Sequence, residues 1–310
     1  MTPFDLITMG RVGVDLYPEQ TGVALADVRT FAKSLGGSAT NVAVAASRLG
    51  ARAAVITKVG DDPFGPYIRR ALGEFGVDAR FVGTDPTLRT PIVFCEVHPP
   101  DDFPLLFYRE PTAPDMTLEL AELDLETIET VPLFWTTGTG LSAEPSRTAT
   151  LAALAARGRR AITVHDLDYR PVFWSSADDA GRYGRDAVAL ATVAVGGLVE
   201  AVPLVGERSR ADTARALLDL GAELAVVKLG PEGVLAATND EQVVVPPVEV
   251  EVVNGLGAGD AFGGALCHGL LAGWALEQVI RFANAAGAIV ASRLGCADDM
   301  PSEDEVLALL

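Results

Sequence analysis

Short apolar runs alternate with longer helix-like segments along most of the 310-residue chain. The runs, many of them rich in β-branched residues, are FDLITMG (4–10), AAVITKVG (53–60), LFWTTG (133–138), AITVHDLD (161–168), TVAVGG (192–197) and LAVVKLG (224–230). Segments of helical length lie between them, for example at 38–50, 146–158 and 211–221. This alternation is typical of βαβ units, so it predicts an α/β fold with a mostly parallel sheet and helices on both faces.

Helix boundaries are marked by residues that commonly begin or end helices. Ser38 precedes the first helical segment and is expected to be its N-cap. Gly50 follows that segment, and Gly76 and Gly221 follow two others. We expect these three glycines to end their helices, because glycine tolerates the left-handed conformation found there.

Two segments, about 11–34 and 86–110, interrupt the alternation. They contain strand-like pieces, VGVDLYP, TPIVFCEV and PLLFYRE, separated by turns without a helix. We expect them to form a small antiparallel sheet that projects from the core as a lid. The lid has no core of its own, so the interpretation is a single domain over 1–310.

Composition narrows the function classes. The formal net charge of −18 repels nucleic acid and anionic membranes, so neither is an expected partner. An anionic substrate would require local cations.

Three separated cysteines and three separated histidines show no zinc-binding spacing, and we expect buried, reduced thiols. The N-terminus lacks the features of a secretion signal, and the apolar run 187–206 contains Glu200 and Pro203; we expect a buried strand and helix there and a cytoplasmic location.

The segment NGLGAGD (254–260) precedes an apolar run of helical length. Its glycines allow several backbone N–H groups to converge, and the helix dipole favours an anion at the same point. Asp260 would then be placed to accept a proton. The alternative is an ordinary glycine-rich turn followed by an acidic first-turn residue. Neither GxxxxGK[ST] nor GxGxxG is present, which argues against a P-loop or Rossmann site.

Two segments together resemble the ribokinase-like, or PfkB, sugar kinases. SLGGSATNVAVAASRLGARAAVITKVGDDPFG resembles the N-terminal signature of that family, and NGLGAGDAFGGAL resembles its C-terminal signature, usually written DTxGAGD. The similarity covers nearly the whole chain. It implies a ribokinase-like three-layer α/β/α core with the small β lid, and ATP-dependent phosphorylation of a sugar hydroxyl.

The resemblance implies roles for the catalytic segment. Asp260 would be the general base, and the N–H groups of Gly257, Ala258 and Gly259 would form the anion hole. Asn254 stands where the family usually has Asp, which puts potassium dependence in question and leaves a monovalent cation as one option.

The remaining site residues follow from the same resemblance. Sugar contacts are implied for Asp15, Gly36, Gly37 and Asn41; a solvated turn and an exposed helix residue are the alternatives for Asp15 and Asn41. Nucleotide contacts are implied for Lys228, Gly230, Gly233 and Asn284. Glu200 occupies the acid of the family's NxxE magnesium motif, but Gly197 replaces the Asn, so Glu200 could act on Mg²⁺ through water.

Two further segments indicate a sugar acid as the substrate. LLFYREPTAPDM and DLDYRPVFWSS resemble segments of sugar-acid kinases and contribute Arg109 and Arg170. Arginine binds carboxylates through two parallel hydrogen bonds. The alternatives are surface arginines or ion pairs with Glu110 and Asp168. Within the family, the segments MGRVGVDLYPEQ, TFAKSLGGSATNVA and DLDYRPVFW resemble kinases of 5-dehydro-2-deoxy-D-gluconate, which phosphorylate its 6-hydroxyl in inositol catabolism.

Several alternatives stay open from sequence alone. The substrate could be 2-dehydro-3-deoxygluconate or a neutral sugar such as fructose or ribose, and a sugar-binding regulator without catalysis is the non-enzyme reading. A dehydrogenase is a weaker option. We also expect a homodimer through the lid, because an apolar lid face containing Ile92, Phe94 and Leu106 would need covering.

Overall fold

The computed structural model of the protein describes residues 3–310. Its main sheet is mostly parallel. The parallel strands are β1 (Leu6–Met9), β4 (Ala53–Gly60), β5 (Val82–Asp85), β8 (Leu133–Thr137), β9 (Ile162–Asp166), β10 (Val193–Gly197) and β11 (Leu224–Lys228). Two further strands, β12 (Val234–Ala237) and β13 (Gln242–Val245), extend it antiparallel. The order is β13-β12-β11-β10-β9-β8-β1-β4-β5, which confirms the predicted α/β fold.

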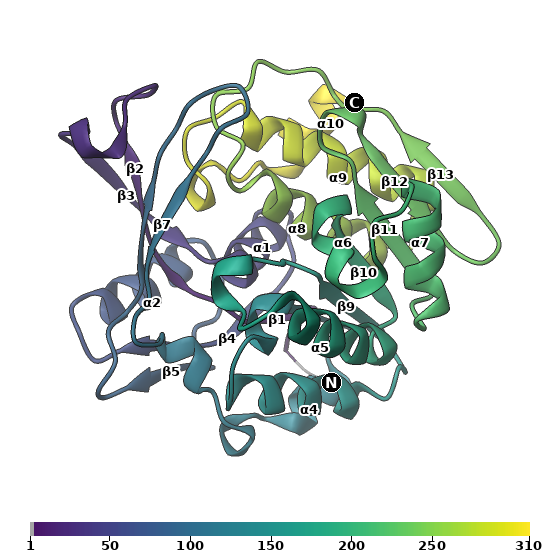
Figure 1. The fold of residues 1–310 in the computed structure, drawn as a ribbon, viewed down its shortest axis with the longest axis horizontal. Helices are drawn as coiled ribbons and strands as arrows, with labels where there is room; N and C mark the ends of the chain where they lie inside the picture. The colour runs from purple at the N-terminus through teal and green to yellow at the C-terminus, as the bar shows by residue number, and fades with distance from the viewer. Residues whose placement is uncertain (1–2) are drawn as a thin grey trace.

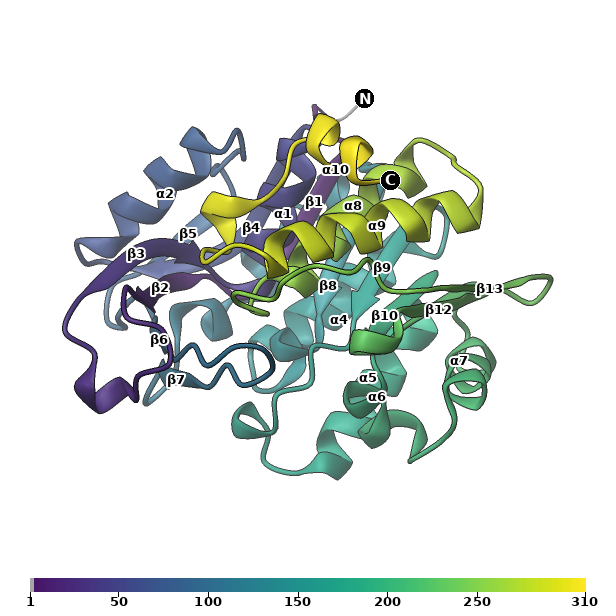
Figure 2. The same cartoon turned by 90° about the horizontal axis from the view of Figure 1, so that it is seen from above.

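Helices cover both faces of this sheet, as Figures 1 and 2 show. One face carries α1 (Ser38–Arg48), α2 (Phe64–Glu74), α8 (Ala258–Leu271), α9 (Leu276–Ala291) and α10 (Glu303–Leu309). The other carries α3 (Leu125–Thr130), α4 (Ser146–Arg157), α5 (Ala177–Leu190), α6 (Leu198–Val205) and α7 (Arg210–Asp219). Successive residues of β1 point to opposite faces, so Leu6 packs in the core beneath α1 and α8 while Ile7 packs beneath α3 and α4. The result is a three-layer α/β/α core.

The predicted helix ends agree with the structure, but one predicted start does not. Gly50, Gly76 and Gly221 follow their helices with φ of +92°, +76° and +123°, as expected. Ser38 is not the N-cap of α1. Gly37 occupies that position with φ +105°, and the Ser38 hydroxyl donates to Asp168 at 2.9 Å. The Ser38 hydroxyl therefore bonds to a residue far away in the sequence and not to a backbone N–H group of its own helix.

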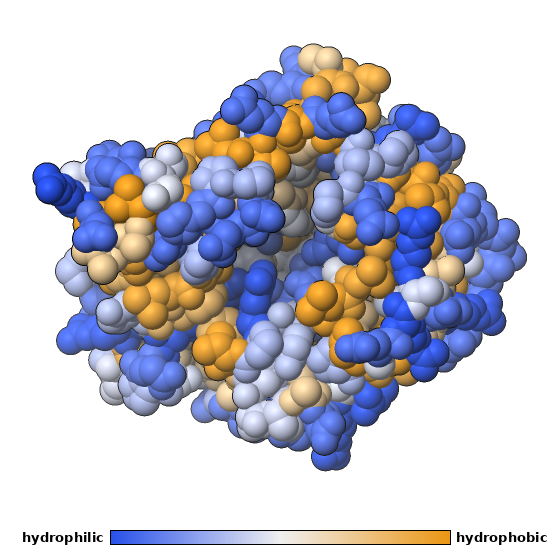
Figure 3. Space-filling view, turned by 45° about the horizontal axis from the view of Figure 1, so that its top comes forward, coloured by the Kyte–Doolittle hydropathy of each residue, from blue (hydrophilic) through white to orange (hydrophobic). Residues whose placement is uncertain are grey.

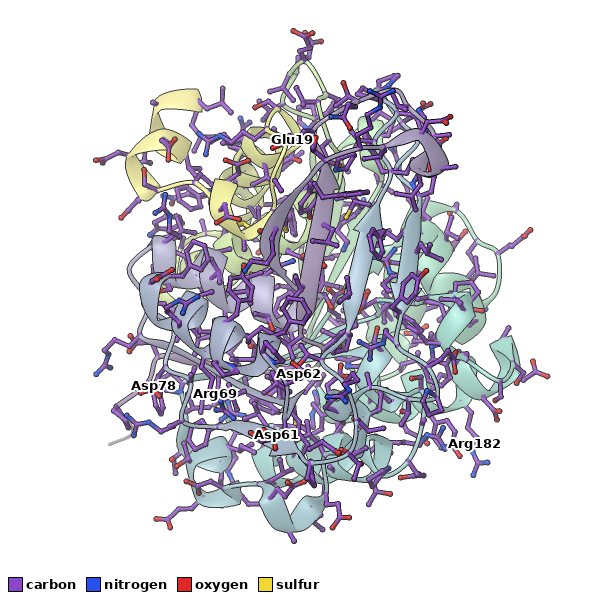
Figure 4. All side chains as sticks on the ribbon, turned by 90° about the vertical axis from the view of Figure 1, so that its left-hand side faces the viewer. Glu19, Asp61, Asp62, Arg69, Asp78 and Arg182 are labelled. Carbon is purple, nitrogen blue, oxygen red and sulfur yellow. The ribbon has the colours of Figure 1, made fainter. Side chains whose placement is uncertain are left out.

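The lid consists of β2 (Gly13–Pro18), β3 (Phe31–Gly36), β6 (Ile92–Cys95) and β7 (Leu105–Tyr108). Its order is β3-β2-β6-β7; the two outer pairings are antiparallel, and β2 pairs with β6 in parallel. Figure 4 shows Glu19 at the far end of this sheet from Asp62. The Asp62 carboxylate accepts from the Thr90 N–H at 2.7 Å and so ties the second lid segment to the start of α2.

The apolar run 187–206 is built as expected. It ends α5, passes through the buried β10 and enters α6. Across residues 3–310, no helix has both the length and the apolar character that crossing a membrane requires. Cys95, Cys267 and Cys296 are buried free thiols, as predicted.

Candidate active site

A cavity lies where the lid meets the carboxyl end of β1. Residues far apart in the chain line it, among them Arg11, Asp15, Asn41, Arg170 and Asp260. Apolar lid side chains, including Val93, Leu105 and Phe107, form another part of the wall. The molecule is visibly hollowed near the middle of the face drawn in Figure 3. This position agrees with the rule that open α/β sheets bind ligands at the carboxyl ends of their strands, where the strand order reverses.

The GAGD segment forms the first turn of α8. Gly257 is the N-cap with φ +82°, and a Cβ there would lie 2.2 Å from the Cys296 sulfur, so both conformation and space require glycine. Ala258, Gly259 and Asp260 are the first three residues of the helix. Their N–H groups have no acceptor within α8, because the first turn of any helix lacks one. The turn therefore offers converging donors and a favourable dipole to an anion.

Asp260 is held in place by a residue from α1. Its Oδ2 accepts a hydrogen bond from Asn41 Nδ2 at 2.8 Å, and the Cys296 thiol lies 3.9 Å from the same oxygen. Asn41 is buried, so the alternative of an exposed helix residue is wrong. Burial raises the pKa of Asp260 to about 6, although the Asn41 hydrogen bond opposes the shift. The carboxylate is thus ionised at neutral pH, yet basic enough to take a proton.

Asp15 is buried on β2 and faces the same cavity. The Tyr17 hydroxyl donates to it at 3.4 Å. Burial raises its pKa to about 6, against the attraction of Arg11. A Cβ at Gly36 would lie 2.0 Å from an Asp15 oxygen, and one at Gly37 would lie 2.3 Å from the Arg11 carbonyl oxygen. The two glycines therefore let the strand β3 pass close to this segment.

The two predicted arginines lie in different surroundings. Arg170 lines the cavity, and its Nε donates to Asp168 at 3.2 Å. The Arg109 guanidinium is buried and donates through Nη2 to both Asp115 oxygens, at 2.9 and 3.0 Å. Arg109 is not among the residues that line the cavity. Its partner is thus Asp115 and not the expected alternative Glu110.

Sequence reasoning missed Arg11, gave Asp166 no role and considered Asp168 only as an ion-pair partner of Arg170, a pair that the structure contains. Arg11 is the second residue after β1, in the short segment where the chain leaves the main sheet for the lid. Its position just after a parallel strand could have marked it as a site residue, because ligands bind at the carboxyl ends of such strands. Asp168 accepts from Ser38, which lines the cavity, and from Thr139, at 2.9 and 2.7 Å, and so joins three chain segments.

A charged cluster lies at the ends of β9, β10 and β11. Lys228 Nζ is 3.9 Å from Asp166 and 3.8 Å from Glu200. Burial would lower the pKa of Lys228, but Asp166, Glu200 and Asp260 together raise it, so the ammonium stays charged. A Cβ on Gly259 would lie 3.6 Å from Lys228 Nζ, which places this cation beside the first turn of α8.

The same cluster provides hard oxygen donors for a metal. No group of three or more metal-binding side chains occurs within residues 3–310. Magnesium bound to nucleotide phosphates needs only one or two carboxylates and completes its shell with water, so Asp166 and Glu200 fit it. Glu200 also accepts from the Gly197 N–H at 2.5 Å, which fixes its carboxylate at the start of α6.

The predicted nucleotide residues other than Lys228 lie near the antiparallel end of the sheet. Gly230 and Gly233 have φ of +57° and +91°, and they bound the short turn between β11 and β12. A Cβ at Gly233 would lie 3.0 Å from the Pro246 Cα. Asn284, on α9, donates to the Pro246 carbonyl at 2.7 Å. The structure therefore brings Gly233 and Asn284 against the same residue.

The chain is similar to known carbohydrate kinases over almost its whole length. The family model described as pfkB family carbohydrate kinase matches residues 4–303. The 5-dehydro-2-deoxygluconokinase of Photobacterium profundum is 36% identical over 310 residues, covering 97% of this chain and 93% of that protein. A Vibrio cholerae fructokinase structure with bound fructose, ADP and potassium has a TM-score of 0.87 and 28% identity, covering 99% of this chain and 98% of that one. A sugar kinase from Pyrococcus horikoshii in complex with ATP has a TM-score of 0.81 and 27% identity, covering 98% of this chain and 100% of that one.

Proposed function

Because this chain belongs to the pfkB family of carbohydrate kinases, we propose that it transfers the γ-phosphoryl group of ATP to the 6-hydroxyl of 5-dehydro-2-deoxy-D-gluconate. The observation that carries this proposal is the position of Asp260. It sits in the first turn of α8, beside free backbone N–H groups, in a cavity that also contains Arg11 and Arg170. A base, an anion site and cations for an acidic sugar thus share one cavity.

Phosphoryl transfer follows from this geometry. Asp260 takes the proton of the sugar hydroxyl as its oxygen forms a bond to the γ-phosphorus and the bond to the ADP oxygen breaks. The N–H groups of Gly257, Ala258 and Gly259 stabilise the charge on the transferred group. Asn41 orients the Asp260 carboxylate, and Asp15 accepts hydrogen bonds from sugar hydroxyl groups. No covalent enzyme intermediate is needed.

The nucleotide extends from Lys228 toward Gly230, Gly233 and Asn284. Lys228 lies between the acidic pair and the first turn of α8, where its charge can stabilise the phosphates. Asp166 and Glu200 would hold Mg²⁺, Glu200 directly or through water. When bound, the ion neutralises phosphate charge. The three free thiols are consistent with a cytoplasmic reaction.

The loop before α8 bears on whether turnover depends on potassium. Asn254 is fully buried; its Nδ2 donates to the Leu294 carbonyl at 2.7 Å, and its Oδ1 accepts from the Leu256 N–H at 3.0 Å. A neutral amide thereby joins the loop before α8 to the loop after α9, and it brings no negative charge that would attract a cation. We propose that turnover does not require added potassium.

A substrate panel tests the function. ADP release would be measured with 5-dehydro-2-deoxygluconate, 2-dehydro-3-deoxygluconate, fructose and ribose, each with and without potassium. We expect the highest kcat/KM for the first acid, with less than a twofold effect of potassium. Activity on neutral sugars alone would refute the acid assignment. Binding of an acid without ADP release would favour the non-catalytic regulator, and a tenfold stimulation by potassium would refute the role given to Asn254.

A further inference from the structure

Arg11 is a buried cation that lines the cavity. It is the second residue after β1, next to which the strand order reverses, and it is 8% exposed. Its backbone is fixed on two sides: the carbonyl oxygen accepts from Thr40 Oγ1 at 3.1 Å, and Gly37 packs against the same carbonyl. The side chain lines the cavity, with its guanidinium carbon 5.7 Å from the centre of the Phe107 ring on the lid.

Among the residues that the structure describes, none accepts a hydrogen bond from the guanidinium of Arg11. Its Nε is buried without a hydrogen bond, and within residues 3–310 no carboxylate lies within ion-pair distance of the group. The other arginines with shielded or cavity-facing guanidinium groups each have at least one acceptor, although Nη1 of Arg109 is also buried without a hydrogen bond. Arg109 pairs with Asp115, Arg170 pairs with Asp168, and Arg157 donates to backbone carbonyls such as that of Ile128.

An unpaired buried guanidinium is costly, because burial removes water from a charge without replacing its hydrogen bonds. The charge of Arg11 lowers the pKa of three carboxyl groups, but none of them is close enough to form an ion pair with it. These groups belong to Asp15, Asp168 and Asp260. The free planar fork matches the two oxygens of a carboxylate. The Arg11 guanidinium also shares the cavity with Asp15, the proposed sugar-binding residue, and lies near the Phe107 ring of the lid.

We propose that Arg11 is the specificity-determining residue of this site and that its guanidinium binds the carboxylate of the sugar acid. This inference deepens the proposed function and rests on it. Arg170, half engaged by Asp168, contributes the second charge at the cavity. Arg109, held by Asp115, positions the segment after β7 and does not contact the substrate. Selection of an acid over a neutral sugar therefore depends on a residue of the N-terminal segment.

The test compares 5-dehydro-2-deoxygluconate with its neutral primary amide in the full-length protein. In Arg11→Gln we expect kcat/KM for the acid to fall about 100-fold, mainly through KM, whereas kcat/KM for the amide changes less than threefold. The KM for MgATP should not change. Arg11→Lys should restore part of the acid preference, because it keeps the charge and loses the fork. Arg70→Gln, which removes an exposed guanidinium on α2, is the matched control and should behave as wild type.

The other possible results separate failure of the Arg11 inference from failure of the proposed function. If Arg11→Gln keeps the wild-type preference for the acid, the inference is wrong while the proposed function stands. If the variant loses kcat equally on acid and amide, Arg11 serves the transferred phosphoryl group instead. If the wild type phosphorylates only neutral sugars, the proposed function itself fails at the first measurement, and this inference fails with it. Thermal unfolding separates these results from misfolding, since removing an unpaired buried charge should not lower the stability of Arg11→Gln.

Discussion

At the residue scale, Asp260 combines two opposing demands. Its raised pKa of about 6 makes it a better base, but an ionised carboxylate in partial burial destabilises the folded state. The pKa is higher in the folded than in the unfolded chain, so this penalty is present above about pH 6 and is absent below the unfolded value near 3.8. Activity and stability should therefore respond to this residue in opposite directions.

Asp260→Asn tests both effects. We expect kcat to fall at least 1,000-fold, because the amide cannot take the hydroxyl proton, while the free energy of unfolding at pH 7.5 rises by about 1–2 kcal/mol. In the wild type, kcat/KM should decrease as pH falls through about 6, where Asp15 also titrates. Steady-state kinetics and thermal unfolding measure these changes. A variant with near-normal turnover would remove Asp260 from the role of base.

At the element scale, the close packing of α1 and α8 sets the distance between Asn41 and Asp260. Gly264 of α8 lies directly against α1: a Cβ there would be 2.4 Å from the Ala45 Cβ and 2.8 Å from the Ala46 nitrogen. Any side chain at this position must push the helices apart. The Asn41–Asp260 hydrogen bond of 2.8 Å joins the same two helices, so it depends on this contact.

Gly264→Ala should therefore lower the free energy of unfolding by about 1–3 kcal/mol, although alanine is the better helix former. It should also reduce kcat, because the base would lose its orientation. Gly73→Ala in α2 is the control: a Cβ there meets nothing within 4 Å, and stability should rise by about 0.5–1 kcal/mol. Chemical denaturation of both variants measures the difference. Equal effects at the two positions would show that helix spacing is not the cause.

At the scale of the whole molecule, the lid has an outer apolar face that lies away from the cavity. Leu106 and Tyr108 are 47% and 61% exposed, and Phe94 packs edge-to-face against Tyr108. Their neighbours in the sequence, Leu105 and Phe107, line the cavity, as strand alternation requires. We propose that a second copy of the chain covers the outer face.

Light scattering tests this association. We expect a mass of twice the 32.4 kDa chain for the wild type and a single chain mass for Leu106→Asp. Val244→Asp is the matched control, since Val244 is equally exposed at 48% but lies on β13, and it should remain dimeric. A wild type that stays monomeric at micromolar concentration would contradict the proposal.

The sequence by itself determined the sheet, the helices around it and the position of the glycine-rich turn. Apolar periodicity and left-handed glycines such as Gly50 and Gly221 are local properties, so they could be read without coordinates. Three of the four lid strands, β2, β6 and β7, were predictable for the same reason, whereas β3 and the parallel pairing of β2 with β6 were not. Asp260 and Asn41 could be singled out through their motifs, but not their hydrogen bond, which joins residues 219 positions apart.

Only the tertiary structure decided which charged groups are paired. It linked Ser38 to Asp168 instead of to its own helix, engaged Arg109 with Asp115 and left Arg11 without an acceptor. The partner of an arginine depends on which chain segments meet in space, and this cannot be predicted from the local periodicity of apolar residues. The sequence thus predicts that cations must gather at the cavity of a protein with charge −18, while the fold determines which arginine is free to bind the substrate.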